Sequence, residues 1–264
     1  MLLVIDQGNT NAVFALYEGD RQRGKWRASK DPRRTADEYA VWLTQLLALK
    51  DLKLSDIEEA IIASVVPAAN FNLVTFCQKY LNTEPMVVGQ AGIDIGIPVR
   101  AEQVGADRLV NAVAAFERHG GPLIVIDFGT ATTFDIVGED GGYDGGIIAP
   151  AAEHSVEALY RMAAQLPRVA IEPPEQVIGR ATVPAMKSGV YWGYVALIEG
   201  LVARIKAEYG KPMKVIATGG LAPTYAEATE AIEAVDPDIT LRGLRLIHRA
   251  NSKHKAERKG GGRS

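Results

Sequence analysis

Two short segments place a carboxylate and a glycine turn at the end of an apolar run. They are Asp6-Gln7-Gly8-Asn9-Thr10-Asn11 and Asp127-Phe128-Gly129-Thr130-Ala131-Thr132-Thr133. A turn that contains glycine can point successive backbone N–H groups at one spot, which suits a phosphate group. A carboxylate beside it suits Mg²⁺, which prefers oxygen ligands. We therefore expect a phosphate site, with Asp6 holding Mg²⁺ through water and the hydroxyls of the second segment facing phosphate oxygens.

The two segments are copies of one pattern. Leu3–Asp6 and Ile124–Asp127 are apolar runs, and a second apolar run follows each turn. Each copy predicts a β-hairpin. Taken alone, each could be an ordinary turn, with the threonines of the second copy satisfying strand ends. The repetition favours phosphate binding and predicts two α/β lobes with a cleft between them, residues 1–120 and 121–248.

Other patterns predict the elements around the turns. Thr35 to Glu38 reads as a capping box that begins a helix. Ala60 to Val66 reads as a buried strand that ends at Pro67, and Gly145-Gly146 as a further turn. Residues 249–264 hold six Lys or Arg and one Glu and end in Gly-Gly-Gly-Arg-Ser, which predicts a disordered basic tail.

Two further segments could take part in phosphoryl transfer. Asp107, in Gly105-Ala106-Asp107-Arg108, begins a predicted helix and could act as a general base toward an acceptor hydroxyl. An acid in a first turn is also a common helix-dipole residue. Thr218-Gly219-Gly220 follows a predicted strand and would let adenosine approach the backbone, or would be a plain helix start.

Composition excludes several classes of protein. The chain has 264 residues, a formal net charge of −3 and one cysteine, so neither a disulfide framework nor a cysteine-based zinc site is expected. No segment approaches the length of a membrane span, and no Gly-x-x-x-x-Gly-Lys-(Ser/Thr) motif is present. We expect a cytoplasmic protein with neither a nucleic-acid nor a membrane partner.

Together these segments resemble the type III pantothenate kinases. This family belongs to the actin/hexokinase/Hsp70-like ATPases, whose two lobes are ribonuclease H-like. The resemblance runs almost the length of the chain through the following stretches: Asp6–Asn11, Ser64–Pro67, Gly105–Ala112, Asp127–Thr133, Gly145–Pro150, Thr182–Gly189 and Ala217–Gly220.

The resemblance implies ATP-dependent phosphorylation of pantothenate, the first step of coenzyme A biosynthesis, in a homodimer. It implies Asp107 as catalytic base, and a cation, K⁺ or NH₄⁺, at Asp127. It implies that pantothenate lies against Gly105, Ala106, Asp107, Arg108 and Thr182, with the pocket completed across the dimer interface. It implies that ATP lies against Asp6, Gln7, Gly8, Asn9, Thr10, Asn11, Ala12, Val13 and Thr130, with Gly219 and Gly220 at the adenosine.

Three positions depart from the family pattern. Pro98 to Val104 replaces an Asn-Pro-x-Glu stretch, Ala151 replaces a glycine, and Gln7 stands where valine is common. If that glycine had a positive φ, Ala151 would be strained. The alternatives are a kinase of the same superfamily with another substrate, a non-catalytic regulatory protein of the same fold, and an actin-like polymer.

Overall fold

A computed structural model describes residues 1–29, 31, 33–162 and 166–260, and side chains as far as residue 253. The chain forms two compact units. The first consists of Met1–Glu117 together with Asp238–Ser264, and the second of Arg118–Pro237. The chain passes from the first unit to the second after Glu117, close to the expected boundary at residue 120. It returns to the first unit at Asp238, and the sequence did not indicate this return.

The first unit is built on a five-stranded sheet of order β3-β2-β1-β4-β5. Its strands are β1 (Leu2–Gln7), β2 (Asn11–Glu18), β3 (Arg21–Ser29), β4 (Glu59–Ser64) and β5 (Met86–Val87). β1 and β2 form the predicted antiparallel hairpin, and β4 pairs with β1 in parallel. The carboxyl ends of β1 and β4 therefore meet at one edge of the sheet, where ligands bind in open α/β sheets.

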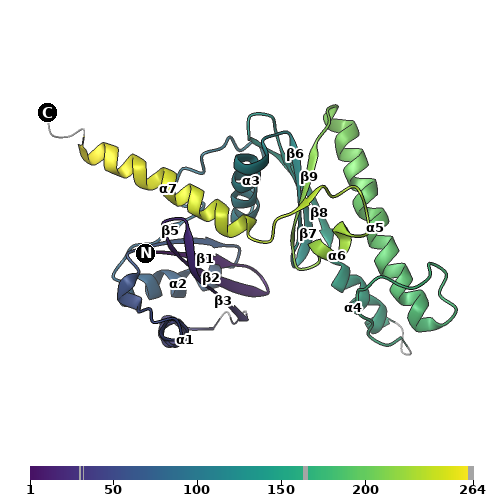
Figure 1. The fold of residues 1–264 in the computed structure, drawn as a ribbon, viewed down its shortest axis with the longest axis horizontal. Helices are drawn as coiled ribbons and strands as arrows, with labels where there is room; N and C mark the ends of the chain where they lie inside the picture. Colours follow the sequence, from purple (N-terminus) through teal and green to yellow (C-terminus); the bar gives the residue numbers. More distant parts are fainter. Residues whose placement is uncertain (30, 32, 163–165, 261–264) are drawn as a thin grey trace. The chain divides into compact units, whose positions relative to one another are not determined.

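Helices cover both faces of this sheet (Figure 1). Alternate residues of β1 face opposite ways. Leu3 and Ile5 pack with α1 (Ala36–Ala48) and α2 (Pro67–Tyr80), whereas Val4 packs with α3 (Ala106–His119) and α7 (Ile239–Gly260). A short 3₁₀ turn, η1 (Leu54–Asp56), follows α1. Thr35 and Glu38 form the predicted capping box at the start of α1.

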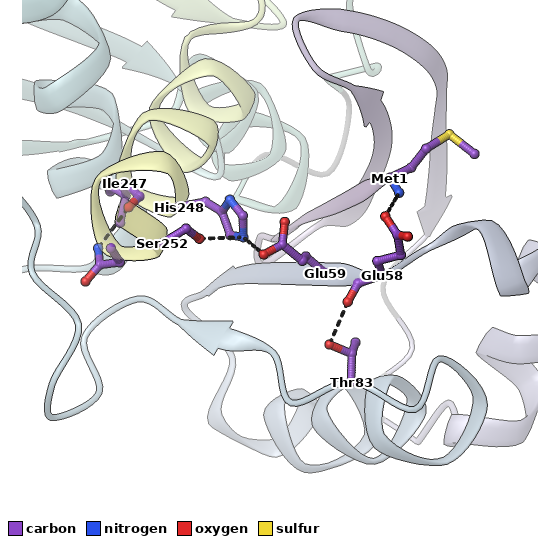
Figure 2. Close-up of polar contacts among 8 residues, drawn as sticks. Met1, Glu58, Glu59, Thr83, Ile247, His248 and Ser252 are labelled. Carbon is purple, nitrogen blue, oxygen red and sulfur yellow. Dashed lines mark hydrogen bonds and ion pairs between the residues drawn. The ribbon is translucent and has the colours of Figure 1, made fainter. Parts of the chain in front are cut away.

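The segment expected to be a disordered tail begins inside the last helix of the structure. Residues 249–260 continue α7, and the remaining residues 261–264 lie outside the described residues. Leu241, Leu244 and Ile247 precede this segment in α7 and are buried against the first sheet, so the first part of the helix has an apolar face. Figure 2 shows a polar contact of the same helix, in which His248 Nε2 lies 3.6 Å from Glu59 Oε1. Residues 238–248 therefore belong with the first unit.

The second unit is built on a sheet of order β10-β9-β6-β7-β8. Its strands are β6 (Leu123–Phe128), β7 (Ala131–Val137), β8 (Tyr143–Pro150), β9 (Lys214–Gly219) and β10 (Ala234–Val235). β6 and β7 form the second predicted hairpin, and β9 pairs with β6 in parallel. Gly145 and Gly146 lie within β8 and not in a turn, because they pair with Ile136 and Asp135 of β7.

The helices of the second unit are α4 (Ala152–Met162), α5 (Thr182–Tyr209) and α6 (Ala222–Ala226). α5 and α6 cover one face of the sheet. Tyr191, Tyr194 and Ile198 of α5 pack with Ile126 of β6 and Tyr225 of α6 in a buried apolar cluster. Within the described residues, no helix is long and apolar enough to cross a membrane.

Candidate active site

The first glycine turn joins β1 to β2 at the carboxyl end of β1. The N–H of Gly8 donates to the carbonyl oxygen of Asn11 at 3.0 Å, which closes the turn. A Cβ at position 8 would lie 3.3 Å from that oxygen, so a side chain would crowd the turn. Asn9 and Thr10 are exposed at its tip. The turn thus presents backbone and polar side chains at the sheet edge, as predicted.

Two residues of the predicted ATP-binding segment have their side chains in the interior. Gln7 is buried, and its Nε2 donates to the carbonyl oxygen of Gly8 at 2.9 Å. Ala12 pairs with Gln7 and packs in the core beside α1 and α2. Asp6 and Val13 pair with each other, and both are partly exposed. Gln7 and Ala12 can therefore contact a nucleotide only through their backbone. The side-chain amide of Gln7 stabilises the turn through its hydrogen bond to Gly8.

Asp107 lies in the first turn of α3, near the same edge of the first sheet. The N–H of Val65 donates to the carbonyl oxygen of Gln7 at 3.2 Å, so the segment after β4 lies against the end of β1. A Cβ built on Gly105 would lie 3.7 Å from Cγ1 of Val65 and 2.7 Å from Oδ1 of Asp107. Gly105 therefore lets the carboxylate of Asp107 fold back toward the sheet edge that carries the first turn.

The environment of Asp107 favours a proton acceptor. Burial raises the pKa of its carboxyl, while the Arg108 backbone hydrogen bond and the Arg108 charge lower it. The effect of burial is the larger one, so the pKa is raised and the carboxylate is a better base than an exposed aspartate. Oδ1 accepts the N–H of Arg108 at 2.8 Å, which orients the group. The helix-dipole interpretation alone predicts no such burial.

The second glycine turn joins β6 to β7 and differs from the first in length. Here the N–H of Gly129 donates to the carbonyl oxygen of Ala131 at 3.1 Å. Phe128 pairs with Thr132, whereas in the first hairpin Gln7 pairs with Ala12, one residue further along. Thr130 is exposed at the tip, and Asp127 is partly exposed at the strand end. The repeat thus holds for the hairpins, and the first loop has one extra residue.

The threonines of the second turn do not all face outward. Thr132 is buried and its hydroxyl contacts the hydroxyl of Tyr194, which also donates to the carbonyl oxygen of Pro150 at 2.9 Å. Thr133 donates its hydroxyl proton to Asp135 at 3.0 Å. The hydroxyl of Thr132 is therefore used by a hydrogen bond inside the protein, and the expectation that it faces phosphate is wrong. Thr130 is exposed and remains the candidate for a phosphate contact.

The parallel pairing of β9 with β6 brings the predicted adenosine segment to the second turn. Gly219 pairs with Phe128, and the N–H of Gly220 donates to the Phe128 carbonyl oxygen at 3.2 Å. Gly219 has φ +91°, and a Cβ there would lie 2.4 Å from the same oxygen. Only glycine fits this position. Gly219 and Gly220 therefore lie beside Gly129 in the second turn, whose Thr130 is the candidate for a phosphate contact.

Thr182 lies apart from the other predicted residues of the second unit. It is exposed at the first position of α5, twelve residues before Tyr194, which contacts Thr132. At ~1.5 Å per helical residue, that is roughly 18 Å along the helix. The fold of one chain therefore does not bring Thr182 to the second glycine turn.

The departures from the family pattern have local consequences. Ala151 is buried and is not among the non-glycine residues with positive φ, so the expected strain is absent there. Gln103, in the replaced stretch before Gly105, does have a positive φ of 54°. This conformation is uncommon outside glycine and asparagine, and the sequence pattern did not indicate it.

Comparisons with known proteins place this geometry in a class. An ethanolamine utilization protein, EutJ, from Carboxydothermus hydrogenoformans has a TM-score of 0.52 at 14% identity, covering 93% of this chain and 89% of its own. A Campylobacter jejuni protein assigned to the Baf family of transcriptional activators has a TM-score of 0.58 at 19% identity, covering 95% and 99%. These likenesses show the fold alone, and the two α/β units fit the actin/hexokinase/Hsp70-like fold.

Sequence comparison gives the family. The profile of the type III pantothenate kinases matches residues 2–204. A type III pantothenate kinase of Paramagnetospirillum magneticum is 64% identical over 255 residues, covering 96% of this chain and 98% of its own. One of Rhodospirillum rubrum is 63% identical over 254 residues, covering 95% and 99%. The chain belongs to the type III pantothenate kinase family.

Proposed function

We propose that this protein transfers the γ-phosphoryl group of ATP to the primary hydroxyl of pantothenate, giving ADP and 4′-phosphopantothenate. The observation that carries the proposal is the carboxyl of Asp107, held beside Gly105 at the edge where β1 and β4 end. The family membership supports the same reaction. In the cell the product would serve coenzyme A biosynthesis, and we propose that the enzyme works in the cytoplasm.

Asp107 is the proposed general base. It accepts the proton of the pantothenate hydroxyl as the oxygen attacks the γ-phosphorus, and ADP leaves as the new ester bond forms. Gly105, Ala106 and Arg108 are the proposed pantothenate contacts around it. Phosphoryl transfer needs little covalent help from the protein, so position and charge account for most of the rate.

The proposed nucleotide contacts are the two glycine turns and the end of β9. Residues 6 to 13 and Thr130 would contact the phosphates, and Gly219 and Gly220 the adenosine. Within the described part of the chain, no three His, Cys, Asp or Glu side chains gather into a metal site. Mg²⁺ commonly takes one or two carboxylates together with phosphate and water, so Asp6 alone at the first turn fits it. Such an ion would neutralise charge on the phosphates.

The exposed apolar side chains of the second unit support the proposed homodimer. Of the twelve large apolar residues exposed in the described part of the chain, eight lie between residues 148 and 192. Met162 is 87% exposed at the end of α4, and Ile178 is 79% exposed before α5. Exposed apolar groups of this size gather at protein interfaces. Thr182 begins α5 within this region, so a second copy could bring its own groups to Thr182.

The dimer can be tested by placing charge on this region. Met162→Glu combined with Ile178→Glu should shift the sedimentation coefficient to that of a monomer. Leu49→Glu is the matched control, because Leu49 is also strongly exposed but lies after α1 in the first unit. A dimer that survives the double substitution as well as the control would remove this region from the interface.

The reaction itself is tested by ADP release from ATP and Mg²⁺, with and without pantothenate, in matched K⁺ and Na⁺ buffers. Mass spectrometry should identify 4′-phosphopantothenate. Release that needs pantothenate and K⁺ supports both the reaction and the cation at Asp127. Turnover of another alcohol in place of pantothenate would favour a different kinase of the superfamily. A folded protein without turnover in either salt would favour a regulatory role.

A further inference from the structure

The second unit contains a buried carboxylate that the proposed reaction does not use. Asp135 lies in the middle of β7 with no exposed surface. Its Oδ1 accepts the hydroxyl of Tyr143 at 2.7 Å, and its Oδ2 accepts the hydroxyl of Thr133 at 3.0 Å. Tyr143 is also buried, at the start of β8. A buried carboxylate is costly unless donors such as these hydroxyls bind it. The two hydrogen bonds therefore stabilise Asp135 in the interior.

The strand register places this group beside Asp127. Thr133 and Asp135 are two residues apart in β7 and therefore share a face of the sheet. Thr133 pairs directly with Asp127 of β6, so these two side chains share that face as well. Directly paired side chains in an antiparallel sheet have Cβ atoms ~5 Å apart. Asp127 and Thr133 are partly exposed, whereas Asp135 and Tyr143 lie deeper.

The hydrogen bond to Asp135 fixes what the hydroxyl of Thr133 can do. A threonine hydroxyl has one proton to donate and two lone pairs to accept with. Because Asp135 takes the proton, the oxygen of Thr133 is left as an acceptor. It cannot then donate to a phosphate oxygen or to the carboxylate of Asp127. Two acceptor oxygens on paired positions suit a cation, whose ligands are oxygens of this kind.

We propose that Thr133 is a ligand of the monovalent cation assigned to Asp127, and that Asp135 and Tyr143 are positioning residues that keep its oxygen an acceptor. The inference rests on the proposed function, since it extends the cation site of that reaction. It assigns Thr133 to the cation and leaves the phosphate contact of the second turn to Thr130.

The test measures cation binding by stability, so it does not depend on turnover. The unfolding midpoint of the protein is measured against KCl, with choline chloride holding the ionic strength constant. The wild type should show a saturable rise that NaCl does not reproduce. Thr133→Val should raise the half-saturating K⁺ concentration at least tenfold. Thr133→Ser, which keeps the hydroxyl, should leave it within about threefold of the wild-type value. Asp135→Asn should also raise it, because an amide can donate to the Thr133 oxygen and reorient its proton.

A merely structural role for these residues gives a different pattern. Thr133→Val would then lower the unfolding midpoint equally in every salt and leave the K⁺ dependence unchanged, which would overturn the proposal. A wild type with no K⁺-specific rise would overturn it too. Thr83→Val is the matched control, because Thr83 donates its hydroxyl to the Glu58 carbonyl oxygen in the first unit. Pantothenate-dependent ADP release, measured on the same samples, tells failure of this proposal from failure of the proposed reaction.

Discussion

The backbone N–H of Arg108 donates to Oδ1 of Asp107 at 2.8 Å, so the proposed base is oriented by the residue that follows it. Gly105 makes this possible, since a Cβ there would lie 2.7 Å from the same oxygen. The carboxylate is thus held by its own helix start and directed to the edge of the first sheet.

Asp107→Asn should abolish most turnover while the protein folds. The amide keeps an oxygen for the Arg108 hydrogen bond but cannot accept the substrate proton. General bases contribute about 10²–10⁴-fold, so kcat should fall by that factor. The measurement is steady-state ADP release, with circular dichroism to confirm the fold. A loss below tenfold would remove Asp107 from the role of base.

The same substitution should make the protein more stable at neutral pH. Burial raises the pKa of Asp107 in the folded protein above its unfolded value. Between these two values the folded chain binds more protons than the unfolded chain, so stability falls as pH rises through that window. Asparagine has no such proton to lose. The free energy of unfolding of Asp107→Asn, from urea titration, should therefore exceed the wild-type value at pH 7. The two values should converge as the pH falls below the unfolded pKa of aspartate.

The pH dependence of kcat/KM should show the raised pKa directly. The acid limb should fall with unit slope below an apparent pKa that lies above ~3.9, the value of an unperturbed aspartate. Because the positive charge of Arg108 lowers the pKa of Asp107, Arg108→Ala should move this limb to higher pH. A limb that stays in place in Arg108→Ala would contradict the assignment, whatever the change in KM.

Gly219→Ala should destabilise the second unit, and Gly220→Ala should not. Gly219 has φ +91°, and its added methyl group would lie 2.4 Å from the carbonyl oxygen of Phe128. Strain of this kind costs on the order of 1–3 kcal/mol. Gly220 has no atom within 4 Å of an added Cβ and is the matched control for stability. Equal urea midpoints for the two variants would argue against close approach of β9 to β6.

Gly243→Ala should lower stability although alanine is the better helix former. An added methyl group in α7 would lie 2.1 Å from the carbonyl oxygen of Val110 in α3. Overpacking costs about 1–3 kcal/mol, more than the ~1 kcal/mol gained in helix propensity. Gly193→Ala in α5 meets no atom within 4 Å and should be neutral or stabilising. Since Val110 follows Asp107 by one helical turn, Gly243→Ala should also reduce kcat.

The sequence alone determined the elements that depend on local pattern. The two hairpins, the capping box at Thr35 and the strand that leads to Gly219 were predicted because apolar periodicity and turn residues are local signals. The resemblance also pointed to the family, whose profile matches residues 2–204. The segment Gly105–Arg108 indicates Asp107 as a candidate base, but the sequence does not indicate that its carboxyl is buried.

Only the tertiary structure decided which polar groups face inward and which parts of the chain pack together. The sequence does not place the start of α7 with the first unit, because its apolar residues Leu241, Leu244 and Ile247 find their partners only in the first sheet and α3. Thr132 and Thr133 look alike in sequence, yet strand alternation sends one to Tyr194 and the other to Asp135. The extra residue in the first turn appears only in the strand register. These features depend on partners far along the chain, and a local pattern carries no information about such partners.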